Sequence, residues 1–310
     1  MGHPAAPGPP GGVDSHAYHG TAMELPKKIG RYEIIKVIGQ GMRMVYKARD
    51  PEFDRLVMLN VWRFWEGKPA AHERWFREMK RYGLLTHPNL VVAYDVGECD
   101  GMTYLATELL DGEPLVKVIP AGTWLSLLQR IAIIQQISGG LQFVHDHDIV
   151  HRDVKPANIF LSKDGTAKLV ELTPTLDELE GPLVQYCLTV AYASPEVLQG
   201  EVVDGRADVF SLGCTFYELV EGRRPFEAAS GVDVVRHILH DPPQPSQQAR
   251  DLHLPQLQRV FDKALAKQRE SRYQSCSEFS QDLDRLKARL ESGHRSRTDT
   301  WFEGIRRWFN

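Results

Sequence analysis

The sequence predicts an α+β fold with two lobes, a small antiparallel β lobe that contains one helix and a larger, mainly α-helical lobe. Short apolar runs joined by turn-rich pieces fill the first part of the chain, which is typical of an antiparallel sheet. Longer continuous or amphipathic apolar stretches follow, which is typical of buried helices. The pattern changes near residues 109–115, and we expect a ligand cleft where the two lobes meet.

The β lobe is predicted from alternating and apolar runs that end at the turn-rich pieces "RDPEFDR" and "ECDG". Strands are expected at residues 32–39, 44–50, 56–62, 90–98 and 102–110. The helix of this lobe is expected over residues 68–86, where Trp75, Phe76, Met79 and Leu84 recur at roughly helical spacing. In the larger lobe we expect helices over residues 124–147, 207–222, 254–266 and 276–292.

The chain is expected to have three parts. Residues 1–30 are rich in Pro and Gly and predict a disordered arm. Residues 31–290 form the folded domain, with an N-lobe of about 31–112 and a C-lobe of about 113–290. Residues 291–310 form a tail with a short amphipathic helix, whose apolar face is made by Trp301, Phe302, Ile305, Trp308 and Phe309.

Composition excludes several classes of function. The net charge of −4 gives no general polyanion-binding signature, so we expect no nucleic-acid partner. No run approaches the roughly 18 apolar residues of a membrane span, and the N-terminus lacks the features of a signal peptide. Widely spaced cysteines without a CxxC pair indicate free thiols in a reducing compartment. The expected location is therefore cytoplasmic.

The segment with the clearest chemistry is "HDIVHRDVKPANIFLSKDGTAKLVEL". Here His-Arg-Asp ends at Asp153, and Lys155 and Asn158 follow at the spacing of a protein-kinase catalytic loop. In such a loop the aspartate accepts the proton of the substrate hydroxyl, the lysine neutralises phosphoryl charge and the asparagine ligates Mg²⁺. Asp153, Lys155 and Asn158 are therefore the candidate catalytic residues.

With this motif in place, the chain resembles the Hanks-type Ser/Thr protein kinases, particularly the bacterial ones, over roughly residues 32–288. The resemblance implies the two-lobed protein-kinase-like fold. "IGQG" is similar to the start of the family's glycine-rich loop, which would place Gly39, Gly41 and Val45 beside a nucleotide. The implied ligands are ATP with Mg²⁺ or Mn²⁺ if nucleotide binding is retained, and otherwise none; the implied partners are proteins.

Further motifs carry the resemblance. "YLATELLDG" is similar to the hinge, which makes Thr107 the gatekeeper and places the backbone of Glu108 and Leu110 against adenine. Glu78 stands where the family's helix-C glutamate sits. Three residues match positions that mainly hold the family fold, namely Glu196 of "SPE", Asp208 of "ADVFSLG" and Arg272 of "ESRYQS".

The first departure from the family is in the strand that normally reads Val-Ala-Ile/Leu-Lys, which here reads "VMLN". Asn60 replaces the lysine that contacts the phosphates and pairs with the helix glutamate. It offers a neutral hydrogen bond without charge and leaves Glu78 without that partner. Met58 replaces a small alanine beside the adenine, and its flexible side chain either adapts to a ligand or fills the space.

The second departure is at the metal motif, where Asp-Phe-Gly becomes "ELT", residues 171–173. Glu171 keeps the negative charge and is, with Asn158, the predicted metal ligand. Its extra methylene shifts the carboxylate, while Mg²⁺ requires near-ideal octahedral geometry. A misplacement of about 1 Å costs roughly 100-fold in rate.

The third departure is in the glycine-rich loop. Aligned on "VYKA", the loop is one residue short, and Arg43 takes the place of the third glycine. In the "with no lysine" kinases a lysine at this position supplies the missing cation, so Arg43 is a candidate surrogate, although arginine binds as a planar fork. If the loop is counted from Gly39 without a gap, Met44 takes the position instead.

These departures together predict a pseudokinase, a signalling protein of this fold with weak or no phosphotransfer that acts as a binding or scaffold module. The first alternative is an active Ser/Thr protein kinase that transfers the ATP γ-phosphate to protein hydroxyls with Arg43 in place of the missing lysine. The second is a membrane-associated adaptor whose C-terminal helix lies on the membrane surface.

Overall fold

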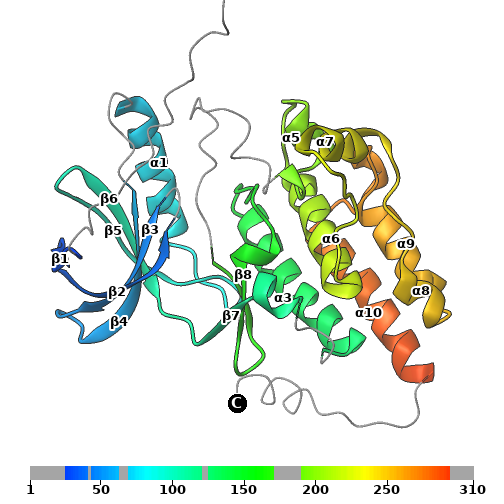
Figure 1. The fold of residues 1–310 in the computed structure, drawn as a ribbon, viewed down its shortest axis with the longest axis horizontal. Coiled ribbons are helices and arrows are strands. Elements are labelled where there is room, and N and C mark those ends of the chain that lie inside the picture. The colour runs from blue at the N-terminus through cyan, green and yellow to red at the C-terminus, as the bar shows by residue number, and fades with distance from the viewer. Residues whose placement is uncertain (1–24, 41–42, 63–68, 121–124, 171–189, 294–310) are drawn as a thin grey trace, which may run out of the picture.

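The computed structural model describes residues 25–40, 43–62, 69–120, 125–170 and 190–293. A sheet with one helix forms the first lobe, and the second lobe beside it is mainly helical (Figure 1). The predicted α+β fold of two lobes is confirmed. In the described part of the chain, no helix combines the length and apolar character that a membrane span requires.

The sheet of the first lobe is antiparallel, with the strand order β1-β2-β3-β4-β6-β5. Asp100 and Gly101 adopt positive φ angles of 50° and 70° at the turn between its last two strands, which suits the two-residue hairpin turn expected of "DG". The strands are β1 Lys28–Ile29, β2 Tyr32–Gln40, β3 Met44–Asp50, β4 Arg55–Trp62, β5 Ala93–Cys99 and β6 Met102–Glu108.

Strand β4 divides its side chains between the two faces of the sheet, because successive residues of a strand point to opposite sides. One set, Val57, Leu59 and Val61, belongs to a core that is confined to the β lobe. Trp62, from the other set, belongs to the large core that includes the helix α1 (Pro69–Tyr82) and the C-lobe. Asn60 is two positions from Trp62 on the same strand, so its side chain lies on the face that α1 covers.

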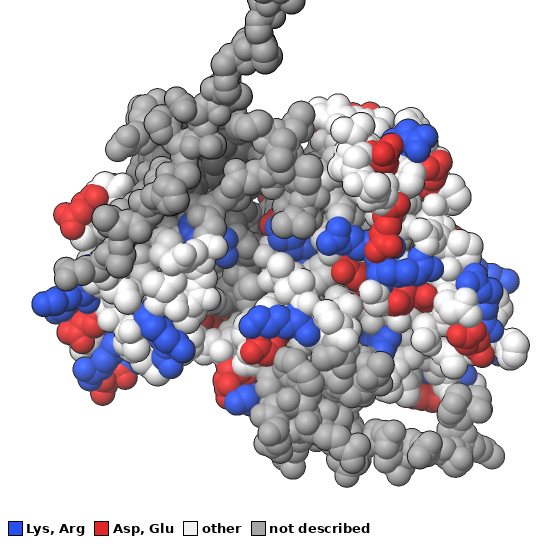
Figure 2. All heavy atoms as spheres, viewed as in Figure 1, with Lys and Arg blue, Asp and Glu red and all other residues white. Residues whose placement is uncertain are grey.

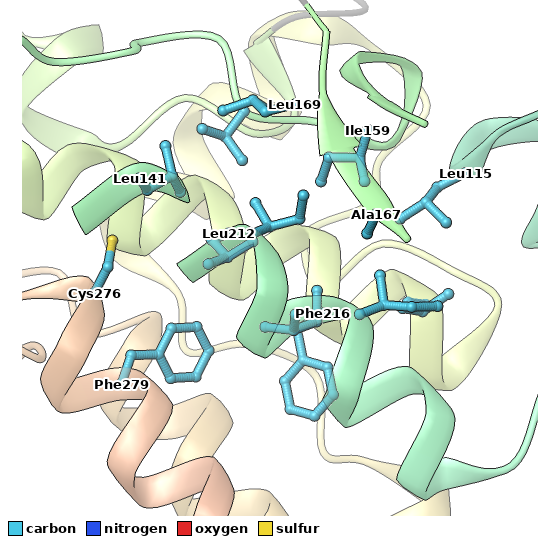
Figure 3. Packing of buried hydrophobic residues seen from close by; sticks show 14 of the residues in the cluster. Leu115, Leu141, Ile159, Ala167, Leu169, Leu212, Phe216, Cys276 and Phe279 are labelled. Atoms are coloured by element: carbon cyan, nitrogen blue, oxygen red, sulfur yellow. The ribbon is translucent and has the colours of Figure 1, made fainter. Parts of the chain in front are cut away.

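The helical lobe is built around α3, α6 and α10, which pack against one another. Figure 3 shows Leu141, Leu212 and Phe279 among the apolar side chains of these helices, together with side chains of strands β8 and β9. The elements are β7 Gly112–Pro114, α2 Leu115–Val118, α3 Leu127–His145, the 3₁₀ turn η2 Pro156–Asn158, β8 Ile159–Ser162, β9 Ala167–Leu169, α5 Pro195–Leu198, α6 Gly205–Glu221, α7 Gly231–His240, α8 Gln247–Asp251, α9 Pro255–Ala264, the 3₁₀ turn η4 Arg269–Ser271 and α10 Cys276–Gly293.

The two lobes share backbone hydrogen bonds. Leu90 and Leu169 form an isolated parallel bridge, in which Val91 donates to the Leu169 carbonyl and Leu169 donates to the Asn89 carbonyl, both at 2.9 Å. The residues just before Ala93 take part in this bridge. Strand β5 therefore begins at Ala93 and not at the predicted residue 90. The segment that precedes β5 therefore connects the lobes.

The ends of the domain differ slightly from the predicted boundaries. Strand β1, at Lys28–Ile29, lies within the range predicted as an arm, and Ile29 is buried against the sheet. Helix α10 runs to Gly293, three residues past the predicted end of the domain. The rest of the predicted arm, residues 1–24, and residues 294–310 of the predicted tail lie outside the described residues. Cys214 and Cys276 are buried free thiols.

Candidate nucleotide and phosphotransfer site

The catalytic loop, residues 151–158, brings the three candidate catalytic residues together. Lys155 Nζ lies 2.8 and 2.7 Å from the two carboxylate oxygens of Asp153. Asn158 Nδ2 donates to Asp153 Oδ2 and to the Asp153 carbonyl, each at 2.8 Å. The side chains of Asp153 and Lys155 are each 19% exposed, so solvent still reaches the carboxylate that would accept a hydroxyl proton.

The loop is held by a buried carboxylate from helix α6. Asp208 accepts hydrogen bonds from the backbone N–H groups of His151 and Arg152, each at 2.8 Å, and His145 Nε2 lies 2.7 Å from its Oδ2. Arg152 has a φ angle of 66°, a left-handed conformation that is costly for a side-chain-bearing residue and is fixed here by these bonds. Burial acts to raise the pKa of Asp208, but His145 and the loop donors outweigh it and leave the pKa lowered.

Strand β4 carries the residue that replaces the family's lysine. Asn60 is 6% exposed and pairs across the sheet with Val45 and Leu105. Arg43 Nε donates to Asn60 Oδ1 at 2.8 Å. We refer to Arg43, Met58 and Asn60 as the β4 site.

The structure distinguishes the two alignments of the glycine-rich loop. Met44 packs against the core of the β lobe, on the face away from α1. The side chain of Arg43 reaches Asn60 on the opposite face. Of the two residues that could occupy the third-glycine position, Arg43 is therefore the one that approaches the position of the missing lysine.

The other residues predicted to contact a nucleotide lie on the neighbouring strands of the same sheet. Gly39 pairs with Val45, and a Cβ at Gly39 would come within 3.3 Å of the Val45 Cβ, so glycine keeps the two strands close. Met58 is half-buried and pairs with Thr107, which is almost fully buried. Gly41 lies outside the described residues.

The predicted hinge begins at Glu108, the last residue of β6, and contacts both lobes. Glu108 Oε1 lies 2.5 Å from Lys168 Nζ of β9 and accepts a hydrogen bond from the Val92 backbone at 2.8 Å. Leu110 is half-buried beyond the end of β6. The sequence does not indicate Lys168, because its contact with Glu108 joins residues 60 positions apart in the chain.

Glu78 pairs within its own helix and not with the strand residue that the family would place beside it. Glu78 pairs with Arg81 of the same helix, with 3.3 Å between Oε2 and Nη1, and its side chain is 30% exposed. Glu171 lies outside the described residues, so Asn158 is the member of the predicted metal pair that the structure places. Asn158 Nδ2 donates its hydrogen bonds to Asp153, so the amide oxygen of Asn158 is the atom suited to a magnesium ion.

The residues predicted to hold the fold form a buried ion pair in the C-lobe. Arg272 Nη1 and Nη2 donate to Glu196 Oε1 and Oε2 at 2.6 and 2.7 Å. The two side chains are 0% and 4% exposed. Burial acts to raise the pKa of Glu196, but the Arg272 guanidinium outweighs it and leaves the pKa lowered.

Charge on the visible surface is mixed. Figure 2 shows Lys and Arg side chains interspersed with Asp and Glu side chains over the described part of this face. Such a distribution gives no extended field of one sign there.

Comparison with known proteins assigns the family. The family model described as protein kinase domain matches residues 32–285. The chain is 37% identical to the Serine/threonine-protein kinase PknB of Mycolicibacterium smegmatis, over 85% of this chain and 44% of that protein. It is 35% identical to PknB of Mycobacterium leprae, over 84% and 44%, and 34% identical to the probable PknB of Corynebacterium glutamicum, over 83% and 42%.

The chain thus spans less than half the length of the curated relatives it matches. The match covers both lobes, the catalytic loop and the ion pair of Glu196 with Arg272. The chain belongs to the protein kinase domain family and is similar to the bacterial Hanks-type Ser/Thr kinases.

Proposed function

We propose that the chain is a nucleotide-binding signalling domain of the kinase fold that transfers phosphate weakly or not at all and acts by binding protein partners. The observation that carries this proposal is the hydrogen bond between Arg43 and Asn60 on β4. A neutral amide stands where the family has a lysine, and Glu78 pairs with Arg81 on its own helix. Loss of one preorganised charge-stabilising group costs roughly 10²–10³ in rate.

Arg43 supports retained nucleotide binding in this proposal. A guanidinium keeps its charge at all physiological pH values and presents a planar fork of donors that suits phosphate oxygens. Its Nε donates to Asn60 Oδ1, which places the positive charge of the guanidinium beside the position of the missing lysine. A magnesium or manganese ion bound by Asn158 and Glu171 would neutralise phosphate charge when nucleotide is present.

The second candidate function is a slow Ser/Thr protein kinase, and the geometry of the catalytic loop favours it. Asp153 holds its carboxylate between Lys155 and Asn158, as a general base for a substrate hydroxyl requires. Lys155 would neutralise the transferring phosphoryl group. The two candidates share nucleotide binding and differ in turnover.

Nucleotide binding is tested by the thermal stability of the full chain with millimolar ATP and Mg²⁺ or Mn²⁺. We expect a stabilising shift, and we expect Arg43→Gln to weaken affinity roughly 10- to 100-fold, the range for a hydrogen bond to a charged group. The matched control is Arg49→Gln, because Arg49 is an exposed residue of β3 that pairs with Asp54. Absence of a shift, or equal loss in both variants, would contradict the proposal.

Turnover is tested with ATP, either metal and a generic protein substrate. Kinases reach about 1–100 s⁻¹, and we expect less than about 0.01 s⁻¹ here. A rate within the ordinary range that disappears in Asp153→Asn would reject weak phosphotransfer and establish the second candidate.

The adaptor hypothesis stays a prediction, because the aromatic tail lies outside the described residues. The cytoplasmic location stays a prediction too. Binding to anionic and to neutral liposomes, with and without residues 298–310, separates a membrane-bound adaptor from a domain that meets its partners in solution.

A further inference from the structure

Helix α1 meets strand β4 through two tryptophans. The ring centroids of Trp62 and Trp75 lie 4.9 Å apart with an interplanar angle of 65°, an edge-to-face arrangement that aromatic rings favour. The two residues are 5% and 2% exposed and belong to the core that the lobes share. The pair therefore joins the helix to the sheet in a dry environment.

A second contact lies one turn earlier on the same helix. His72 Nε2 lies 3.0 Å from Thr103 Oγ1 and 3.3 Å from Glu98 Oε1. Thr103 is the direct partner of Trp62 in the pairing of β4 with β6. Positions three apart on a helix share a face, so His72 and Trp75 contact neighbouring residues on adjacent strands.

The β4 site is connected to this contact. The guanidinium carbon of Arg43 lies 6.0 Å from the centroid of the Trp62 ring, at the outer range of a cation–π interaction. Asn60 and Trp62 are two positions apart on β4 and share the face toward α1. A continuous series of contacts thus runs from Arg43 through Trp62 to Trp75.

The ion pair that would ordinarily connect the same two elements is not possible here. Residue 60 is a neutral amide, and the carboxylate of Glu78 is 30% exposed and paired with Arg81. An exposed pair within one helix does not attach that helix to the sheet. The tryptophan pair and the contact of His72 with Thr103 each join α1 to the sheet.

We propose that Trp75 and His72 are the positioning residues that hold α1 against the sheet, in place of an ion pair between strand β4 and Glu78. Apolar and aromatic contacts carry no net charge for salt to screen, and their partners Trp62 and Thr103 belong to the protein itself. The position of α1 is then set chiefly by the buried tryptophan pair and the contact of His72 with Thr103, which salt does not screen and which need no nucleotide. This inference does not depend on whether the domain transfers phosphate.

The test is hydrogen exchange of the full chain without nucleotide, followed in peptides from α1 and, as an internal reference, from α6. In Trp75→Leu we expect the α1 amides to exchange roughly tenfold faster, with α6 unchanged, because local opening follows the loss of tertiary contacts. In Glu78→Gln, and in high salt, we expect changes below about twofold. Equal acceleration in Glu78→Gln, or none in Trp75→Leu, would overturn the proposal.

A milder variant covers the case in which Trp75→Leu does not fold. Thr103→Val keeps the shape of the side chain but removes the oxygen that meets His72. We expect α1 exchange to rise by roughly threefold or more, since a single hydrogen bond contributes about 0.5–1.5 kcal/mol. Exchange at the wild-type rate would contradict the role of His72.

Discussion

The catalytic loop and the β4 site differ in how closely they follow the family pattern. The loop keeps Asp153 with its lysine and asparagine, and buried Asp208 fixes its backbone. The β4 site instead has a neutral amide that is hydrogen-bonded to Arg43. The contrast shows that the larger lobe can keep the arrangement of the family's catalytic loop while the strand that carries the family's lysine changes.

The physical reason lies in what else each residue does. Asp208 satisfies backbone donors of the loop and a histidine of α3, so its replacement would disturb the fold. A lysine at position 60 would chiefly serve the phosphates and Glu78. The tryptophan pair attaches α1 to the sheet without it, so the substitution leaves the core intact.

The largest effect is expected when the buried ion pair of the C-lobe is broken. Arg272→Gln leaves the Glu196 carboxylate buried without its cation, and we expect a loss of about 3–5 kcal/mol in the free energy of unfolding. Urea denaturation measures it. The control is Arg285→Gln, which removes an exposed pair with Asp282 and should cost less than about 1 kcal/mol. Similar costs would contradict the structural role of the buried pair.

An intermediate effect is expected at the joint between the lobes. Lys168→Met removes the cation beside Glu108, whose side chain is 20% exposed, and we expect a loss of about 1–3 kcal/mol. The control Lys163→Met removes a pair with Asp111 that is largely exposed, so its cost should stay below about 1 kcal/mol. Urea denaturation of both variants compares them, and equal losses would show that the hinge does not depend on Lys168.

A pH-dependent effect is expected in the C-lobe. Burial lowers the pKa of Lys267 to about 8, while in the unfolded chain the group titrates near 10.5. Between these values the unfolded chain binds more protons, so this lysine makes stability rise with pH. Cys214 and Cys276 act in the opposite direction, because burial raises the pKa of each thiol.

The contribution of Lys267 is therefore isolated by comparing wild type with Lys267→Met. We expect the wild type to gain free energy of unfolding relative to the variant between pH 7 and pH 9. Denaturation in urea at several pH values measures this difference. A constant difference across the range would contradict the lowered pKa.

The smallest effect is expected at Glu78, which forms a partly exposed ion pair in the β lobe. Its pair with Arg81 is partly exposed, so Glu78→Gln should change the free energy of unfolding by less than about 1 kcal/mol. Urea denaturation compares this variant with Arg272→Gln. A cost as large as that of Arg272→Gln would remove the distinction between the two regions.

Local sequence patterns predicted most of the elements near the site. The runs "MVYKARD" and "LVMLNVW" correspond closely to β3 and β4, because alternation of apolar residues specifies a half-buried strand. The spacing of Asp153, Lys155 and Asn158 predicted a joint arrangement because these residues lie within one short loop. Such features depend on neighbours in the chain.

Other features required the tertiary structure. The contact of Lys168 with Glu108 joins residues 60 positions apart, and the series from Arg43 to Trp75 depends on how a loop, a strand and a helix meet. Whether Arg43 or Met44 approached Asn60 depended on the face to which each side chain points. A one-residue change of register reverses that face, and the sequence around the loop permitted two alignments.

The amino-acid sequence by itself determined the two-lobed class of fold, the catalytic loop and the absence of a lysine at position 60, since each is a matter of residue type and short-range spacing. The tertiary structure decided which cation approaches Asn60 and what attaches α1 to the sheet. These depend on packing between segments that are distant in the chain, because the geometry of such contacts is set only when the core closes around them.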